Sequence, residues 1–155
     1  MVSVTPFLWF NDDAEEALAF YADVFTNSEI VEVTRMDVDS MANGGFVIGT
    51  IRIEDLTITI MNGGPMFSLT EAFSLAVSCK DQAEVDYFWA ALVDSGEPSQ
   101  CGWLKDRFGL SWQIVPTLLP RLLGDPDPVK AGRVRDAMLG MGKIDCAALQ
   151  AAYDE

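Results

Sequence analysis

The order of apolar and polar positions in the first third of the chain predicts a strand, a helix and three further strands. Residues 5–10 are almost wholly apolar, which is typical of a strand buried on both faces. A helical pattern begins at Asp13, a good N-cap residue, and Glu16 is placed to complete a capping box. The strands predicted after this helix are 29–35, 46–53 and 56–61, with turns at Gly44-Gly45 and Glu54-Asp55.

The same order of elements recurs in the second half of the chain. At one constant offset the cap and the aromatic pair are repeated, so that Asp81, Glu84, Phe88 and Trp89 match Asp13, Glu16, Phe20 and Tyr21. Strands are predicted before and after this helix, at 73–79, 102–105 and 110–115. The pattern favours an internal duplication with modules at about 4–62 and 71–116. Two unrelated strand–helix units are the alternative, because such caps are common.

From Pro116 onward the pattern is helical. The sharp break at 125–128 (Asp-Pro-Asp-Pro) is a natural helix start, and helices are predicted at 129–141 and 144–153. Some 40 residues bury too little apolar surface to fold alone, so residues 117–155 are interpreted as a covering appendage. We therefore expect one α+β domain, residues 1–155, built from two βαβββ modules and C-terminal helices.

Charge and composition narrow the possible partners. The formal net charge of −14 opposes binding to nucleic acid or to an anionic membrane, which both need clustered Lys and Arg. The carboxylates are scattered, as on a solubilising surface, and do not form the regular rows of a nucleic-acid mimic. The chain has an odd number of cysteines, far apart in the sequence: Cys79, Cys101 and Cys146. This pattern is typical of reduced thiols in the cytoplasm, and the absence of a long apolar run predicts a soluble protein.

Several ordered motifs resemble those of one known family. They are residues 5–10, 14–17 with Phe20-Tyr21, 62–65, 67–71, 100–106, 109–116 and 125–128. On these motifs the chain resembles, along nearly its whole length, the PhnB-like proteins of the vicinal-oxygen-chelate (glyoxalase/bleomycin-resistance) superfamily. That family often carries the label 3-demethylubiquinone-9 3-methyltransferase. The resemblance implies mixed sheets that curl around a concave pocket, with helices outside, and homodimers that commonly share modules.

The resemblance also implies where metal-using relatives hold their ion, on the concave face. Carried over onto this sequence, those positions fall near Pro6, Thr59, residues 72–74 and Gln113. None of them is a histidine or a carboxylate, and the chain contains no histidine at all. Since transition metals prefer imidazole, thiolate or carboxylate ligands, we expect neither a metal nor another cofactor.

Candidate site residues follow from the same reasoning. Glu71 is the candidate acid–base group, because an apolar pocket rim would raise its pKa, and Gln113 is a candidate polar anchor. Asp106 is a second possible acid–base group, whereas Cys101 lacks a histidine base and has Lys105 as its nearest cation. The candidate ligand-binding residues are Phe7, Trp9, Met61, Asn62, Gly63, Gly64, Met66, Phe67, Cys101, Trp103 and Trp112. Core packing for the large apolar residues and a simple turn for 62–65 are the alternatives.

These observations favour a metal-independent protein that binds a small organic molecule. An enzyme with the lyase, isomerase or transferase chemistry of the superfamily is the alternative, with Glu71 as base and Gln113 as anchor. Methyl transfer is disfavoured, because the chain lacks the Gly-rich loop and the α/β order of a conventional S-adenosylmethionine domain. A structural dimer without a ligand stays open.

Overall fold

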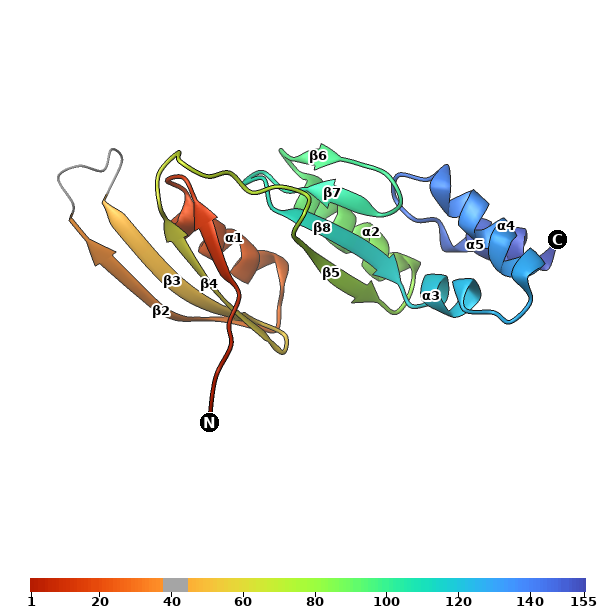
Figure 1. Cartoon of the computed structure of the whole chain (residues 1–155), viewed down its shortest axis with the longest axis horizontal. Coiled ribbons are helices and arrows are strands. Elements are labelled where there is room, and N and C mark those ends of the chain that lie inside the picture. The colour runs from red at the N-terminus through yellow and green to blue at the C-terminus, as the bar shows by residue number, and fades with distance from the viewer. Residues whose placement is uncertain (38–44) are drawn as a thin grey trace. The chain divides into compact units, whose positions relative to one another are not determined.

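The computed structural model describes residues 1–37 and 45–155, which form two compact units, Met1–Leu69 and Thr70–Glu155 (Figure 1). Each unit contains a four-stranded mixed sheet, so the predicted α+β class is confirmed. Gly44, half of one predicted turn, lies outside the described residues. Within the described residues no helix is both long and apolar enough to cross a membrane.

The first unit has the predicted order strand–helix–strand–strand–strand. Its elements are β1 (Phe7–Phe10), α1 (Ala14–Val24), β2 (Ser28–Met36), β3 (Phe46–Ile53) and β4 (Leu56–Asn62). The strands lie in the order β1-β4-β3-β2; β1 runs parallel to β4, and the other neighbours are antiparallel. The described strands therefore carry the βαβββ pattern expected from the sequence.

Alternation along β3 and β4 separates the two faces of the first sheet. Ile51, Ile58 and Ile60 are fully buried on the face that packs against α1. Gly49 lets the helix approach closely, because a Cβ atom there would lie 2.3 Å from Leu18. The opposite face carries half-buried side chains and the exposed Thr57, and α1 does not cover it.

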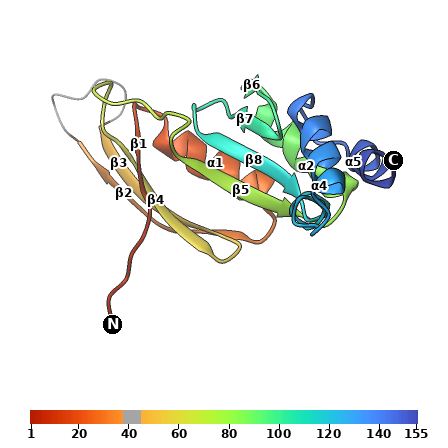
Figure 2. The ribbon, with the colours of Figure 1, turned by 45° about the vertical axis from the view of Figure 1, so that its right-hand side comes forward.

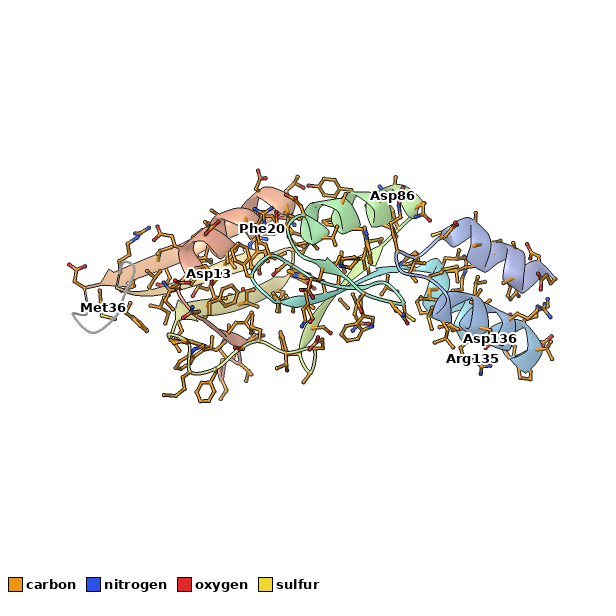
Figure 3. All side chains as sticks on the ribbon, turned by 90° about the horizontal axis from the view of Figure 1, so that it is seen from above. Asp13, Phe20, Met36, Asp86, Arg135 and Asp136 are labelled. Atoms are coloured by element: carbon orange, nitrogen blue, oxygen red, sulfur yellow. The ribbon has the colours of Figure 1, made fainter. Side chains whose placement is uncertain are left out.

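The start of α1 differs from the expected capping box. The helix begins directly after Asp13, as predicted, and Figure 3 shows Asp13 at this end and Phe20 further along the helix. The Asp13 side chain makes no capping hydrogen bond. Instead the buried Oδ1 atom of Asn62 accepts a hydrogen bond from the Ala14 amide at 2.8 Å. The cap therefore comes from the end of β4, and it joins helix to sheet.

The second unit repeats this plan. Its elements are β5 (Ser74–Cys79), α2 (Gln82–Val93), β6 (Glu97–Pro98), β7 (Trp103–Lys105) and β8 (Ser111–Pro116), in the sheet order β5-β8-β7-β6. Here the local cap forms as expected, because the Asp81 carboxylate accepts a hydrogen bond from the Glu84 amide at 3.0 Å. The short strand β6 was not predicted, and it supplies the fourth strand of the module.

Three C-terminal helices follow β8: α3 (Leu118–Leu123), α4 (Pro128–Leu139) and α5 (Cys146–Asp154). Figure 2 shows them beyond the end of β8 that leads into α3. They share an apolar cluster of Leu119, Leu122, Val134, Ile144 and Leu149. Gln82 ties them to α2, since its side chain donates to the Ile144 carbonyl and accepts from the Cys146 amide.

A candidate ligand pocket in the second unit

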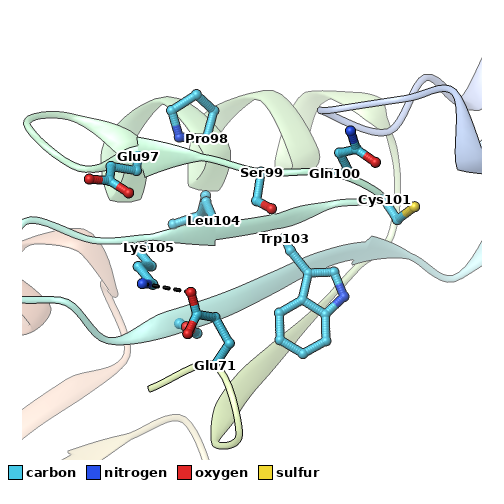
Figure 4. Close-up of a pocket in the computed structure, with 10 residues that line it drawn as sticks. Glu71, Glu97, Pro98, Ser99, Gln100, Cys101, Trp103, Leu104 and Lys105 are labelled. Carbon is cyan, nitrogen blue, oxygen red and sulfur yellow. Dashed lines mark ion pairs between the residues drawn. The ribbon is translucent and has the colours of Figure 1, made fainter. Parts of the chain in front are cut away.

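A cavity of about 400 Å³ opens on the second sheet (Figure 4). It is lined by Glu71, Glu97, Pro98, Ser99, Gln100, Cys101, Trp103, Leu104, Lys105 and Ser111. Along β7, Trp103 and Lys105 point away from the face on which Leu104 is buried. The pocket therefore lies on the face of the sheet opposite the buried core.

An ion pair crosses this pocket. Lys105 Nζ lies 2.6 Å from Glu71 Oε1, and the turn before β5 carries Glu71 (Figure 4). The hydrogen bond from Lys105 lowers the pKa of Glu71, and the same bond raises the pKa of Lys105. The expectation that an apolar rim raises the Glu71 pKa is therefore wrong, because the ammonium group outweighs desolvation. Glu71 is a carboxylate at neutral pH and a weak proton acceptor.

The Ser111 hydroxyl lies beside this pair, in the lining of the pocket. Ser111 pairs in register with Lys105 on β7 and with Ser74 on β5, and it is 1% exposed. Among the described residues its Oγ atom has no hydrogen-bond partner. An unsatisfied buried hydroxyl costs free energy, so such a group is expected to meet a partner in the working state of a protein.

Trp103 provides the aromatic wall of the pocket, and the neighbouring backbone is held in an unusual conformation. Cys101 (φ 58°) and Gly102 (φ 83°) both have left-handed backbone angles. Their amides donate to the carbonyls of Met141 and Gly142, each at 2.8 Å. The segment before α5 therefore fixes this rim of the pocket.

Three other residues singled out from the sequence lie outside the pocket lining. Gln113 is the register partner of Trp103, and its amide nitrogen donates to Ser74 Oγ at 3.0 Å. Trp112 is 2% exposed in the core, where its indole nitrogen donates to Asp106 Oδ2 at 2.9 Å. Asp106 is 3% exposed and also accepts from backbone amides, so it holds a turn together.

The candidates of the first unit gather around Trp9. Its ring meets Phe67 edge-to-face at 5.1 Å, and its indole nitrogen donates to the Gly64 carbonyl at 2.9 Å. A Cβ atom on Gly63 would lie 2.2 Å from the Trp9 ring, so this glycine makes room for tryptophan. Gly64 has φ +87°, which fits the turn interpretation.

The remaining first-unit candidates differ in exposure. Phe7 and Met61 lie on the sheet face opposite the α1 side, and Met66 is exposed. Asn62 is buried as the cap of α1.

Ser111, Glu97 and Ser99 were missed by sequence reasoning. Alternation with the apolar residues Leu110 and Trp112 is the signal that could have placed Ser111 on the opposite face, once its strand was recognised. Glu97 and Ser99 enter the site through β6 and the residue after it. A strand of two residues, such as β6, is recognised only by its pairing with a neighbouring strand, so the local sequence contains no pattern that predicts it.

Two βαβββ units with mixed four-stranded sheets define a fold of the vicinal-oxygen-chelate (glyoxalase) type. The fosfomycin resistance protein FosX from Listeria monocytogenes, solved with Mn(II) and sulfate, has this fold. It superposes on this chain with a TM-score of 0.57 and is 22% identical to it, and the match covers 79% of this chain and 99% of FosX. A protein from Pseudomonas aeruginosa matches with TM-score 0.59 and 17% identity over 75% of this chain and 98% of its own.

The family follows from closer matches. The family model described as 3-demethylubiquinone-9 3-methyltransferase matches residues 2–115. A putative 3-demethylubiquinone-9 3-methyltransferase, PhnB protein, from Bacillus cereus is 30% identical, covers 75% of this chain and 100% of its own, and has a TM-score of 0.68. The chain therefore belongs to this PhnB-like family. No curated protein sequence matches it.

The positions inferred for metal ligands do not fit a divalent transition metal. Thr59 Oγ1 lies 3.1 Å from Thr50 Oγ1, and Gln113 is bonded to Ser74, so these groups are neutral and satisfy one another. In the described part of the chain no three His, Cys, Asp or Glu residues are grouped to hold an ion. Neutral hydroxyl and amide oxygens do not offset the cost of stripping water from such an ion.

Proposed function

We propose that this protein binds a small organic molecule in the pocket of the second unit, without a transition metal. The observation that carries the proposal is the buried Ser111 hydroxyl, which has no hydrogen-bond partner in the described part of the chain and lies in the lining of a cavity of about 400 Å³. Ligand pockets combine apolar walls with a few well-placed polar groups. Trp103 supplies the wall, and Ser111 and Lys105 supply the polar groups.

Catalysis by Glu71 is less well supported than binding. A general base works best with a pKa near the working pH, whereas Lys105 lowers the pKa of Glu71. The family description names a methyltransferase, so methyl transfer is the second candidate. It requires S-adenosylmethionine as a ligand, which makes that compound a necessary member of any binding screen.

The test uses the indole N–H resonances of the four tryptophans in a ¹H–¹⁵N correlation spectrum. A Trp103→Phe variant assigns the Trp103 signal, and a metabolite panel with S-adenosylmethionine is then titrated into the wild-type protein. A ligand in the pocket shifts the Trp103 signal and leaves the buried Trp112 signal in place. A panel in which no compound shifts Trp103 selectively contradicts the proposal.

Metal independence is tested by elemental analysis of protein purified without chelator or affinity tag. We expect no stoichiometric zinc, nickel or manganese. About one equivalent of such a metal per chain, lost in the Gln113→Ala variant, contradicts the proposal and places a metal at Gln113.

A further inference from the structure

We infer that the pocket selects a small aromatic carboxylate, and that the carboxylate of Glu71 occupies the ligand's place until the ligand displaces it. This inference rests on the proposed function, because it names the chemical class that the same pocket takes. The supporting features are the charges of the pocket, the exposure of the ion pair and the buried hydroxyl beside it.

The charges of the pocket limit what can enter it. Among the described residues that line the cavity, Lys105 alone is cationic, whereas Glu71 and Glu97 are both acidic. Glu97 is the register neighbour of Lys105 across β6 and β7. An additional anion would meet two carboxylates and one ammonium group. A ligand carboxylate that takes the place of Glu71 leaves the charge around Lys105 unchanged, so exchange is the electrostatically favourable route.

The exposed position of Glu71 allows a ligand to displace it from Lys105. Its side chain is 63% exposed, on the turn that precedes β5, while the Lys105 side chain is 32% exposed. An ion pair this exposed contributes little stability, because water solvates both partners when they separate. Glu71 can therefore turn into solvent at small cost, and the less exposed Lys105 stays in the lining of the pocket.

The Ser111 hydroxyl favours the exchange of Glu71 for a ligand carboxylate. Its buried hydroxyl has no partner among the described residues while Glu71 holds Lys105. A ligand carboxylate has two oxygens, one to accept from the Lys105 ammonium and one to accept from the Ser111 hydroxyl. An aromatic body on the same ligand would contact Trp103, which lies two positions before Lys105 on β7.

The test compares benzoate with benzamide and benzylamine, which are its neutral and cationic analogues, by titration of the Trp103 indole signal. In wild-type protein we expect benzoate to bind more tightly than either analogue. Glu71→Gln removes the competitor, so benzoate affinity rises by up to about fivefold while benzamide affinity is unchanged. Lys105→Met lowers benzoate affinity by at least about tenfold.

Ser111→Ala separates a binding role from a structural one. Because the hydroxyl has no hydrogen-bond partner among the described residues, this variant should keep the thermal stability of the wild type. It should also lose about threefold or more in benzoate affinity. A marked drop in stability would show that Ser111 has a structural partner, and would overturn the inference.

The two proposals fail in different ways. Equal binding of benzoate and benzamide, tighter binding of benzylamine, no benzoate binding, or weaker benzoate binding by Glu71→Gln each overturn the carboxylate inference. The proposed function then still stands if another panel compound shifts Trp103 selectively, and it falls if none does.

Discussion

The carboxylate of Asp106 organises the turn between β7 and β8. Its Oδ1 atom accepts from the amides of Phe108 and Leu110, and its Oδ2 atom accepts from the Trp112 indole. These donors are buried or part-buried, so they depend on this acceptor. Glu71, the other carboxylate considered as an acid–base group from the sequence, is instead exposed and paired with Lys105.

Replacing Asp106 by Ala is expected to lower the free energy of unfolding by about 3 kcal/mol or more, because buried donors lose a charged acceptor. Urea unfolding measures this as a lower midpoint with little change in slope. Asp94→Ala is the matched control, because Asp94 forms an exposed ion pair with Arg107 and should change stability by under about 0.5 kcal/mol. Similar midpoints for the two variants would refute the structural role of Asp106.

The difference in burial between Asp106 and Glu71 could not be predicted from the sequence. Both were candidate acid–base groups, and neither is followed by a local pattern that fixes its exposure. Exposure depends on which strand face a residue joins and on what packs above it. The tryptophans show the same limit, since Trp103 lines the pocket and Trp112 lies in the core, although both belong to strands of one sheet.

At the scale of elements, local signals located the starts of α1 and α2, but only one of the two predicted local caps forms. Helix α2 begins after Asp81 because that carboxylate and the Glu84 amide are neighbours along the chain. The cap of α1 comes from Asn62, which no local pattern connects with Ala14. The strand β6 was missed for the same reason, because its partner β7 defines it. Elements set by neighbouring residues were predictable, and contacts set by the fold were not.

Gln82 joins two elements, so its replacement tests how the C-terminal helices support the pocket. Gln82→Ala removes the acceptor of the Cys146 amide and a donor to the Ile144 carbonyl. We expect amide hydrogen exchange to accelerate by about fivefold at Cys146, and also at Cys101 and Gly102, which bond to the segment before α5.

Gln150→Ala is the control for this experiment, since the Gln150 amide contacts the exposed Asp154 of its own helix. It should leave exchange at the pocket rim unchanged. Faster exchange at Cys146 without any change at Cys101 and Gly102 would show that the rim does not depend on the docking of α5.

At the scale of the whole molecule, the two units share one strand order, and the sequence indicated this repeated plan through a second cap and aromatic pair at one offset. The family match ends at residue 115, so α3, α4 and α5 lie outside it. The segment that joins α4 to α5 nevertheless contacts the pocket rim through Met141 and Gly142. The regular elements and their order were therefore predictable from the sequence. The contact between the pocket rim and the segment before α5 was not, because it consists of tertiary hydrogen bonds that produce no periodic pattern in the sequence.

The edge strand β2 leads to a prediction about assembly. Among the described residues β2 pairs with β3 alone, and it exposes Ile30, Val31 and Met36, with Val31 55% exposed. A long edge strand with apolar side chains is a liability that proteins cover or charge. We therefore expect a homodimer, and light scattering at micromolar concentration should give twice the 17.0 kDa chain mass.

A lysine on this edge opposes pairing between chains. If the edge takes part in the dimer, Val31→Lys should shift the protein toward the monomer while each chain stays folded. Arg135→Glu, on the exposed surface of α4, is the charge-change control and should leave the mass unchanged (Figure 3). A monomer mass for the wild type at these concentrations would refute the homodimer. A Val31→Lys dimer as tight as the wild type would show that the chains associate through a surface other than β2.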